Sequence, residues 1–307
     1  MKVVYSQLRS AVLSRAEELP VFDPDGRVRE HASDIFVSVR QDDPYLFHLS
    51  KILEGYGDGD DFVFIPNYLF KKSRERSILK RIERIAGEML KDLPDSVFEK
   101  EVEIYKRVVE SITYPKDYED GVKREEHQTI VGSMLNGEAV CSGTAGALNL
   151  LFNRAGIRCG TMRGTSREGA GHSWNVVELG GKRYHLDATG DTMGNTMRFE
   201  AFNITDELCR SLGYSWKSRF ECNDPMMEFY TYNKCRVNAA DVERFVLKKL
   251  EEGAIEVVFR ITDMECWSRE THADVIISSL SEAPLKTASL KVSEEGFARL
   301  TVVRLRA

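Results

Sequence analysis

The stretch NGEAVCSGTAGALNLLFNRAGIRCG, residues 136–160, places one cysteine immediately before a helical pattern. Its apolar residues recur three or four positions apart, which is typical of a helix with one buried face. Gly156 suits the C-terminal end of that helix. The buried face is formed by Ala145, Leu148, Leu151, Phe152 and Ala155. Cys141 is therefore expected at the N-terminus of a buried helix.

The position of Cys141 has a chemical consequence. The first backbone N–H groups of a helix lack partners within the helix, and the helix dipole is positive there, so a thiolate is favoured over a thiol. The alternative is that Cys141 packs as a small buried hydrophobe, as many cysteines do. The stretch alone favours a buried, unreactive cysteine. Other parts of the sequence have to decide whether Cys141 is a nucleophile.

Composition excludes several classes of function. The chain has 307 residues with 43 basic and 49 acidic side chains, so a formal charge of −6 offers no electrostatic footprint for nucleic acid or an anionic membrane. The N-terminal residues 1–20 lack the apolar core of a secretory signal, and no run of eighteen apolar residues occurs. We expect a cytoplasmic protein that binds neither nucleic acid nor membrane. The sequence carries no signal for the oligomeric state.

Cysteine spacing argues against a bound metal. The six cysteines include no C-x-x-C pair and no tight Cys/His cluster, and in a reducing compartment they are expected as free thiols. The glycine-containing stretch GYGDGDD, residues 55–61, lacks the Lys-Ser/Thr of a phosphate-binding loop. We therefore expect no cofactor. A metal held by Cys141, His172, His185 and Asp187 is the weakest alternative, because an acid beside a histidine is better explained by control of the tautomer.

Periodicity divides the chain into three parts, with soft boundaries. Residues 1–95 read as an α+β segment that contains strands at 34–40 (DIFVSVR) and 61–70 (DFVFIPNYLF), a linker at 55–61 and a helix at 73–93. Residues 96–240 form the core and begin with a helix capped by Ser96 and Glu99. Residues 241–307 form a β-rich segment with a helix at 241–253 and strands at 254–261, 272–280 and 298–305.

A second informative stretch is HSWNVVELGGKRYHLDAT, residues 172–189, in which two alternating runs flank Gly180-Gly181. A Gly-Gly pair between such runs predicts a hairpin with a two-residue turn, and the turn fixes the register. His172 and Asp187 then become diagonal neighbours on one face, about 7–8 Å apart between Cα atoms. This separation allows a hydrogen bond between the imidazole and the carboxylate. His185 lies on the same face and competes for the acid.

These residues together suggest nucleophilic catalysis. Cys141 would attack a carbonyl, His172 would act as base and later as acid, and Asp187 would fix the imidazole tautomer. Trp174 lies on the same face and is a candidate for shielding the pair or contacting substrate. The N–H group of Cys141 is one candidate oxyanion donor, and Gln128 in the preceding loop is a candidate for the second. A structural histidine and a turn-forming aspartate are the alternatives for His172 and Asp187.

The stretches 136–157, 171–189 and 202–207 (FNITDE) resemble the bacterial transglutaminase-like domains of the papain-like cysteine proteinase fold. The resemblance is strongest over about 125–210 and covers about half of the chain. It implies an α+β fold with a nucleophile-bearing helix packed on an antiparallel sheet. It also implies a triad of Cys141, His172 and Asp187. Relatives often carry aromatic residues where this chain has Thr144 and Gly190, which are expected to line the cleft.

The function expected from these patterns is attack of a thiol on an amide or peptide carbonyl, with a thioester acyl-enzyme as intermediate. The substrate would be a peptide or protein. Transfer to water would make the protein a peptidase or amidase, which we favour by analogy with bacterial relatives, and transfer to an amine would make it a transglutaminase. The alternative from another class is a catalytically silent domain that binds a peptide or protein partner.

Overall fold

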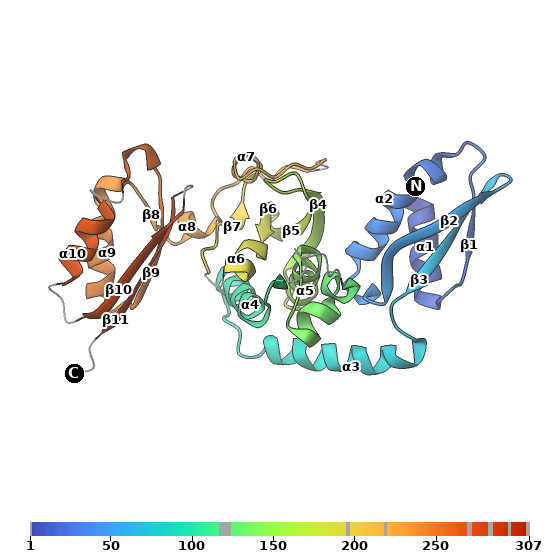
Figure 1. The fold of residues 1–307 in the computed structure, drawn as a ribbon, viewed down its shortest axis with the longest axis horizontal. Helices are drawn as coiled ribbons and strands as arrows, with labels where there is room; N and C mark the ends of the chain where they lie inside the picture. Colours follow the sequence, from blue (N-terminus) through green and yellow to red (C-terminus); the bar gives the residue numbers. More distant parts are fainter. Residues whose placement is uncertain are drawn as a thin grey trace. The chain divides into compact units, whose positions relative to one another are not determined.

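The fold class predicted from the sequence, α+β, is confirmed by the computed structural model (Figure 1). The structure describes residues 2–116, 124–194, 197–217, 220–268, 272–281, 285–293 and 296–304. Two compact units are present, the first formed by Met1–Met197 with Ile204–Asp224 and the second by Arg198–Asn203 with Pro225–Ala307. The division into three parts at about 95 and 240 stays a prediction.

The first unit begins with helices packed on a three-stranded antiparallel sheet of order β1-β3-β2. Apolar side chains of α1, α2 and the three strands form one buried cluster. Because both helices bury one apolar face against the sheet, this part has a hydrophobic core of its own. The elements are α1 (Lys2–Ser14), β1 (Leu19–Phe22), α2 (Arg27–Asp42), the 3-10 helix η1 (Pro44–Leu46), β2 (Leu49–Asp58), β3 (Asp61–Tyr68) and α3 (Lys72–Met89).

Two predictions for this part were wrong. The expected strand at 34–40 lies inside α2, because its apolar residues continue a helical spacing that starts at Ala32 and runs through Phe36 and Val39, all buried. The run of β-branched residues suggested a strand, but the period over the longer window is helical. The expected linker at 55–61 is the end of β2 and a tight turn, where Gly59 has a φ of +57°.

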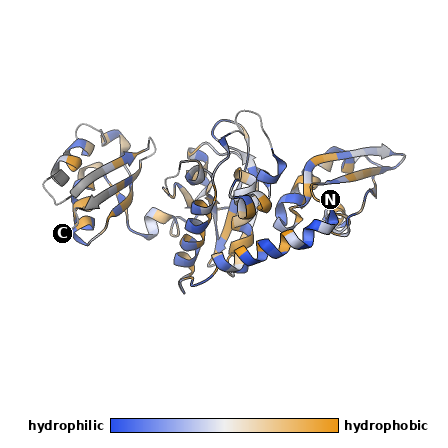
Figure 2. Cartoon of the chain, turned by 60° about the horizontal axis from the view of Figure 1, so that its bottom comes forward, coloured by the Kyte–Doolittle hydropathy of each residue, from blue (hydrophilic) through white to orange (hydrophobic). Residues whose placement is uncertain are grey.

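Two amphipathic helices lead into the core as predicted. The long helix α3 alternates between hydrophobic and hydrophilic residues, as Figure 2 shows, and buries Ile78 and Ile82. Helix α4 (Val97–Ser111) begins at the predicted cap, where the hydroxyl of Ser96 accepts a hydrogen bond from the backbone N–H of Glu99. Such a cap satisfies one of the N–H groups that a helix start leaves without a partner.

Helix α5 packs against β4 and β5 of a sheet of order β4-β5-β6-β7, in which β4, β5 and β6 pair antiparallel. The side-chain amide of Asn175 donates to the backbone oxygen of Ala145 at 2.9 Å, which ties β5 to the helix. The boundary between the two units passes through β7. The elements are η3 (Glu125–Gln128), the π-helix η4 (Gly132–Asn136), α5 (Cys141–Arg154), β4 (Arg158–Thr165), β5 (Gly171–Leu179), β6 (Lys182–Asp187), α6 (Thr189–Gly194), β7 (Ala201–Ile204) and α7 (Asp206–Ser211).

The second unit is a four-stranded sheet of order β10-β11-β9-β8, and its short β8 pairs parallel with β9. Helix α9 packs against β9, and α10 packs against β10 (Figure 1). The elements are α8 (Phe229–Tyr232), β8 (Arg236–Val237), η5 (Ala239–Asp241), α9 (Val242–Glu251), β9 (Glu256–Ile261), η6 (Met264–Cys266), α10 (Asp274–Ser281), β10 (Leu285–Val292) and β11 (Phe297–Arg304). Within the described residues, no helix has the length and apolar character needed to cross a bilayer.

The helix at 241–253 and the strands at 254–261 and 298–305 are confirmed as α9, β9 and β11, apart from Leu305, which lies outside the described residues. The expected strand at 272–280 forms α10 instead. Its β-branched residues favour a strand locally, but the place in the sheet beside β11 is taken by β10. Tertiary pairing therefore overrode local propensity.

Candidate active site

Cys141 is the first residue of α5, as predicted. The preceding Val140 is extended, with φ −91° and ψ −178°, and none of the described side chains caps the first turn. The backbone N–H groups of this turn are therefore free of side-chain acceptors at the end where the helix dipole is positive. The side chain of Cys141 is half-buried. This setting suits a thiol that has to be reached by a substrate.

Close packing of the preceding loop holds the start of α5 in place. A Cβ atom at Gly143 would lie 2.4 Å from the backbone oxygen of His127 and 2.9 Å from the Cβ of Ala139. A side chain at this position would push the loop and the helix apart. Gly143 therefore lets the loop that carries Gln128 approach the nucleophile-bearing helix.

The β5–β6 hairpin forms with the predicted register. Leu179 pairs with Lys182, and Val176 pairs with His185. Gly180 in the turn has a φ of +56°, which suits glycine in a two-residue hairpin turn. The turn therefore sets which side chains of the two strands lie on the same face.

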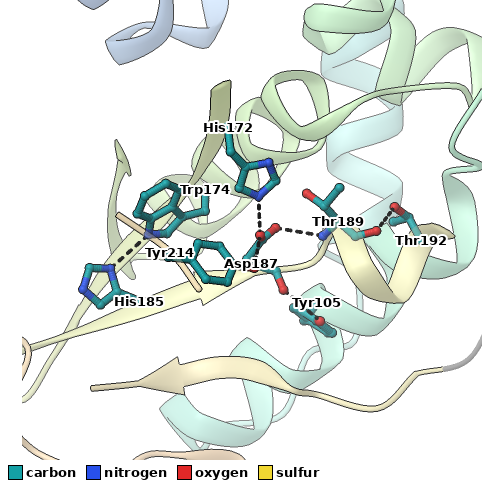
Figure 3. A network of polar contacts seen from close by, with 8 residues as sticks. All are labelled: Tyr105, His172, Trp174, His185, Asp187, Thr189, Thr192 and Tyr214. Atoms are coloured by element: carbon teal, nitrogen blue, oxygen red, sulfur yellow. Dashed lines mark hydrogen bonds and ion pairs between the residues drawn. The ribbon is translucent and has the colours of Figure 1, made fainter. Parts of the chain in front are cut away.

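On that face the predicted histidine–acid pair is present, and Figure 3 shows the network around it. The distance between His172 Nε2 and Asp187 Oδ2 is 2.6 Å. The Asp187 carboxylate also accepts a hydrogen bond from Tyr214 Oη on the same oxygen at 2.7 Å, and one from the backbone N–H of Thr189 on Oδ1 at 2.9 Å. Three donors thus orient a carboxylate that is 7% exposed. Asp187 is the last residue of β6, and its carboxylate contacts both the histidine and the start of α6.

The electrostatics favour a charged pair. Burial alone would lower the pKa of His172, but the Asp187 charge and hydrogen bond, followed by the interaction with Cys141, raise it to about 10. Burial alone would raise the pKa of Asp187, but the His172 charge and the hydrogen bonds from His172 and Thr189 lower it. Attraction between opposite charges therefore outweighs desolvation for both groups. An imidazolium and a carboxylate are expected at neutral pH.

Cys141 lies near His172 and contributes to the raised pKa of its imidazole. Because Asp187 occupies Nε2 of the imidazole, the nitrogen left for the thiol is Nδ1. Cys141 and His172 line one cleft of about 300 Å³, together with Gln128. Gln128 thus lines the same cleft as the nucleophile, and its role as an oxyanion donor stays a prediction. Thr144, expected to line the cleft, is instead 1% exposed inside α5.

The expected substrate-binding or oxyanion role of Trp174 does not fit its surroundings. The side chain is 1% exposed, and its indole N–H donates to His185 Nδ1 at 3.0 Å. Its ring stacks on the His172 ring with 5.9 Å between centroids. Trp174 therefore covers the imidazole and leaves no N–H for a substrate. His185, the expected competitor for Asp187, pairs through Nε2 with Asp206 at 2.8 Å.

His185, Asp206 and Cys222 form the one cluster of metal-ligating atoms in the described part of the chain, within 4.8 Å of one another. A hydrogen bond from Trp174 makes His185 Nδ1 an acceptor, so the proton sits on Nε2, the nitrogen that faces Asp206. Burial raises the pKa of the Cys222 thiol to about 12. When one ring nitrogen of a histidine binds a metal, the other nitrogen carries the proton and donates it to an acceptor. If Nε2 of His185 bound a metal, Nδ1 would have to donate, but Nδ1 faces the N–H of Trp174, which is itself a donor. The cluster is better explained as a hydrogen-bonded chain.

Two residues beside the site carried no signal in the sequence. Tyr214 reaches Asp187 from the segment after α7, and Gln41 of α2 lines the cleft from the N-terminal part. Neither belongs to a motif, and each is separated from its partner by many residues. A neighbouring bridge between Thr165 and Ser215 brings the Tyr214 segment to the sheet. Contacts of this kind become visible only in the folded chain.

Comparisons with solved structures find distant likenesses. One is a transglutaminase, with 12% identity, coverage of 67% of this chain and 61% of that chain, and a TM-score of 0.36. Another is a candidate cysteine protease from Cytophaga hutchinsonii, with 11% identity, coverage of 45% and 61%, and a TM-score of 0.29. A third is a candidate protease from Parabacteroides distasonis, with 14% identity, coverage of 44% and 30%, and a TM-score of 0.26.

The chain thus spans less than two thirds of the length of each of these three proteins. No family model and no curated protein sequence matches it. At these TM-scores the likeness carries no argument about chemistry, which rests on the site itself.

Proposed function

We propose that this protein transfers acyl groups from amide or peptide bonds through a cysteine thioester, with water as the favoured acceptor. The observation that carries the proposal is the 2.6 Å contact between His172 Nε2 and Asp187 Oδ2, with Cys141 as the other neighbour of the same imidazole. A histidine held by a carboxylate at one nitrogen presents the other nitrogen to a nucleophile in a fixed orientation.

In the first half-reaction the Cys141 thiolate attacks the carbonyl carbon of the substrate. A carbon–sulfur bond forms, and the carbonyl oxygen takes the negative charge. Backbone N–H groups at the uncapped start of α5 are suited to stabilise that oxyanion. The carbon–nitrogen bond then breaks, and the amine leaves with the proton of the His172 imidazolium. The acyl group remains on the sulfur as a thioester.

In the second half-reaction neutral His172 takes a proton from a water molecule as the water oxygen attacks the thioester carbon. A carbon–oxygen bond forms and the carbon–sulfur bond breaks, which releases a carboxylic acid and restores the thiolate and the imidazolium. Cys141 is half-exposed at the cleft, which gives water access. An amine in place of water would produce a new amide from the same thioester.

The test begins with the reactivity of the thiol. Iodoacetamide alkylation is followed against pH by peptide mass spectrometry, with the exposed Cys266 of the same chain as internal reference. We expect Cys141 to react about tenfold faster than Cys266 at pH 6, because a thiolate is the reactive species. The advantage should disappear in His172→Ala. Equal rates at the two cysteines, unaffected by His172→Ala, would contradict the proposal.

Turnover is tested with a mixture of peptides in water enriched in ¹⁸O. The wild type should create new peptide C-termini that carry the label, and Cys141→Ala should not. Addition of a biotinylated primary amine separates transamidation from hydrolysis, because only transamidation attaches biotin. A reactive thiol without either product would contradict an enzyme and favour a module that binds a peptide or protein partner.

A further inference from the structure

A cluster of four polar side chains joins α2 to the sheet beside the cleft of Cys141. Ser38 and Gln41 are three residues apart on α2 and lie on one side of it, while Arg163 and Ser173 face each other across β4 and β5. The Arg163 guanidinium donates to Ser38 Oγ at 3.2 Å, and the Gln41 amide donates to Ser173 Oγ at 3.1 Å. We call these four residues the polar quartet.

Three members of the quartet, Gln41, Arg163 and Ser173, line the same cleft as Cys141 and His172. Among the described residues that line it, Arg163 is the one with a permanent charge, and none is an aspartate or glutamate. The chain as a whole carries an excess of acidic residues, with a formal charge of −6. The Arg163 guanidinium thus places a positive charge at the cleft of a protein whose net charge is negative.

The Arg163 guanidinium makes fewer hydrogen bonds within the described chain than its N–H donors allow. Its contact within the described chain is the neutral Ser38 hydroxyl, which engages one of five N–H donors. By contrast, Arg158 on the same strand pairs with the Glu178 carboxylate at 2.8 Å. A guanidinium in a cleft with donors to spare matches the two oxygens of a carboxylate.

Gln41 adds an acceptor to this positive group. Its side-chain oxygen Oε1 is buried and has no hydrogen-bond partner in the part of the chain that the structure describes. A buried polar atom of this kind is costly unless a donor reaches it. A backbone N–H of a bound peptide would be such a donor. Arg163 and Gln41 together therefore complement a carboxylate and a nearby N–H, as an aspartate or glutamate residue of a peptide presents them.

We infer that the polar quartet forms a subsite that selects peptides with an acidic side chain next to the bond attacked by Cys141. The inference rests on the proposed function and names its class of substrate. Arg163 binds the carboxylate, Gln41 binds the peptide N–H, and Ser38 holds the guanidinium from behind. Because α2 supplies two of the four residues, the N-terminal part of the chain takes part in choosing the substrate.

The test uses two alkylating reagents of nearly equal size, N-iodoacetylglycine and N-iodoacetylglycinamide. They differ in whether the far end is a carboxylate or a neutral amide. The rate ratio of the two reagents at Cys141, divided by the same ratio at Cys266, reports the preference for a negative charge. We expect a ratio of roughly ten in the wild type, the factor typical of a charge-assisted hydrogen bond. Arg163→Gln should bring it close to one.

Matched variants separate a role of Arg163 in binding the substrate from a purely structural role in joining α2 to β4. Arg158→Gln removes a cation from the same strand outside the cleft and should leave the ratio unchanged. Ser38→Ala keeps the Arg163 charge but removes the hydroxyl that holds the guanidinium, so it should lower the ratio only in part. Arg163→Lys should keep part of the preference, which covers the case in which Arg163→Gln does not fold. If Arg163 only ties α2 to β4, Arg163→Gln and Ser38→Ala will both lower stability, and neither will change the ratio.

The outcomes of this test and of the proposed function can be told apart. A wild-type ratio of one overturns the subsite, whatever the overall rate at Cys141 is. A ratio near ten that survives in Arg163→Gln also overturns it, because the charge of His172 would then be the source. A ratio that depends on Arg163, in a protein whose Cys141 reacts no faster than Cys266 with the neutral reagent, supports the subsite and contradicts catalysis.

Discussion

Replacement of Asp187 by asparagine is the most direct test of the ion pair at the centre of the site. Asp187→Asn keeps the size of the side chain and removes its charge. The pKa of His172, raised to about 10 in the wild type, should then fall to its ordinary value of 6.5 or below, because burial is no longer opposed by a carboxylate. The pair is 12% and 5% exposed at its two side chains, so solvent screens it little. Loss of one partner of such a buried pair costs about 3–5 kcal/mol.

The cost should depend on pH in a defined direction. His172 has a higher pKa in the folded chain than in the unfolded chain, so its contribution to stability is complete below pH 6.5 and is lost as the pH rises towards 10. Between these limits the difference in the free energy of unfolding between the wild type and Asp187→Asn should shrink by about 1.4 kcal/mol per pH unit. Asp187 itself has a lowered pKa, so its contribution is present above pH 3.8 and is lost as the pH falls below that value.

Two measurements check this prediction. The His172 ring signal is titrated by NMR in both proteins, and urea unfolding is followed at pH 5, 7 and 9 through the indole N–H signal of Trp174. Glu178→Gln is the control, since it breaks an exposed pair with Arg158 on the same sheet and should cost less than about 1 kcal/mol at every pH. A His172 that still titrates near 10 in Asp187→Asn, or a cost that is the same at pH 5 and 9, would refute the reasoning.

The other predictions concern packing around the site. Leu148→Ala should lower the free energy of unfolding by roughly 2–5 kcal/mol, because Leu148 is fully buried, and should leave the alkylation rate of Cys141 unchanged. Gly143→Ala should cost about 1–3 kcal/mol in urea unfolding and also slow alkylation, because the new methyl group meets the backbone of the loop before α5. Tyr214→Phe removes one donor to Asp187 and keeps the ring, so acid unfolding should begin at a higher pH, with a loss of about 1 kcal/mol at pH 7. An unchanged acid transition would show that the hydroxyl contributes nothing to that carboxylate.

Failures of sequence-based prediction in this chain share a cause. The segment 34–40 and the segment 272–280 are rich in β-branched residues, and both form helices, because burial over a longer window or a competing strand decided the outcome. Trp174 was expected either to shield the pair or to contact substrate, and its buried indole, engaged by His185, covers the imidazole. In each case the local pattern allowed two answers, and contacts with distant residues chose between them.

The sequence by itself determined the helix that begins at Cys141 and the pairing of His172 with Asp187. Both depend on interactions between residues close in the chain: helical periodicity in one case and a two-residue glycine turn in the other. Only the tertiary structure brought Tyr214 to Asp187, or α2 and Arg163 to the cleft of Cys141. The hydrogen bonds that make these contacts join residues 27 to 132 positions apart. At such separations no short-range period or turn fixes which side chains meet, and the packing of whole helices and sheets decides it.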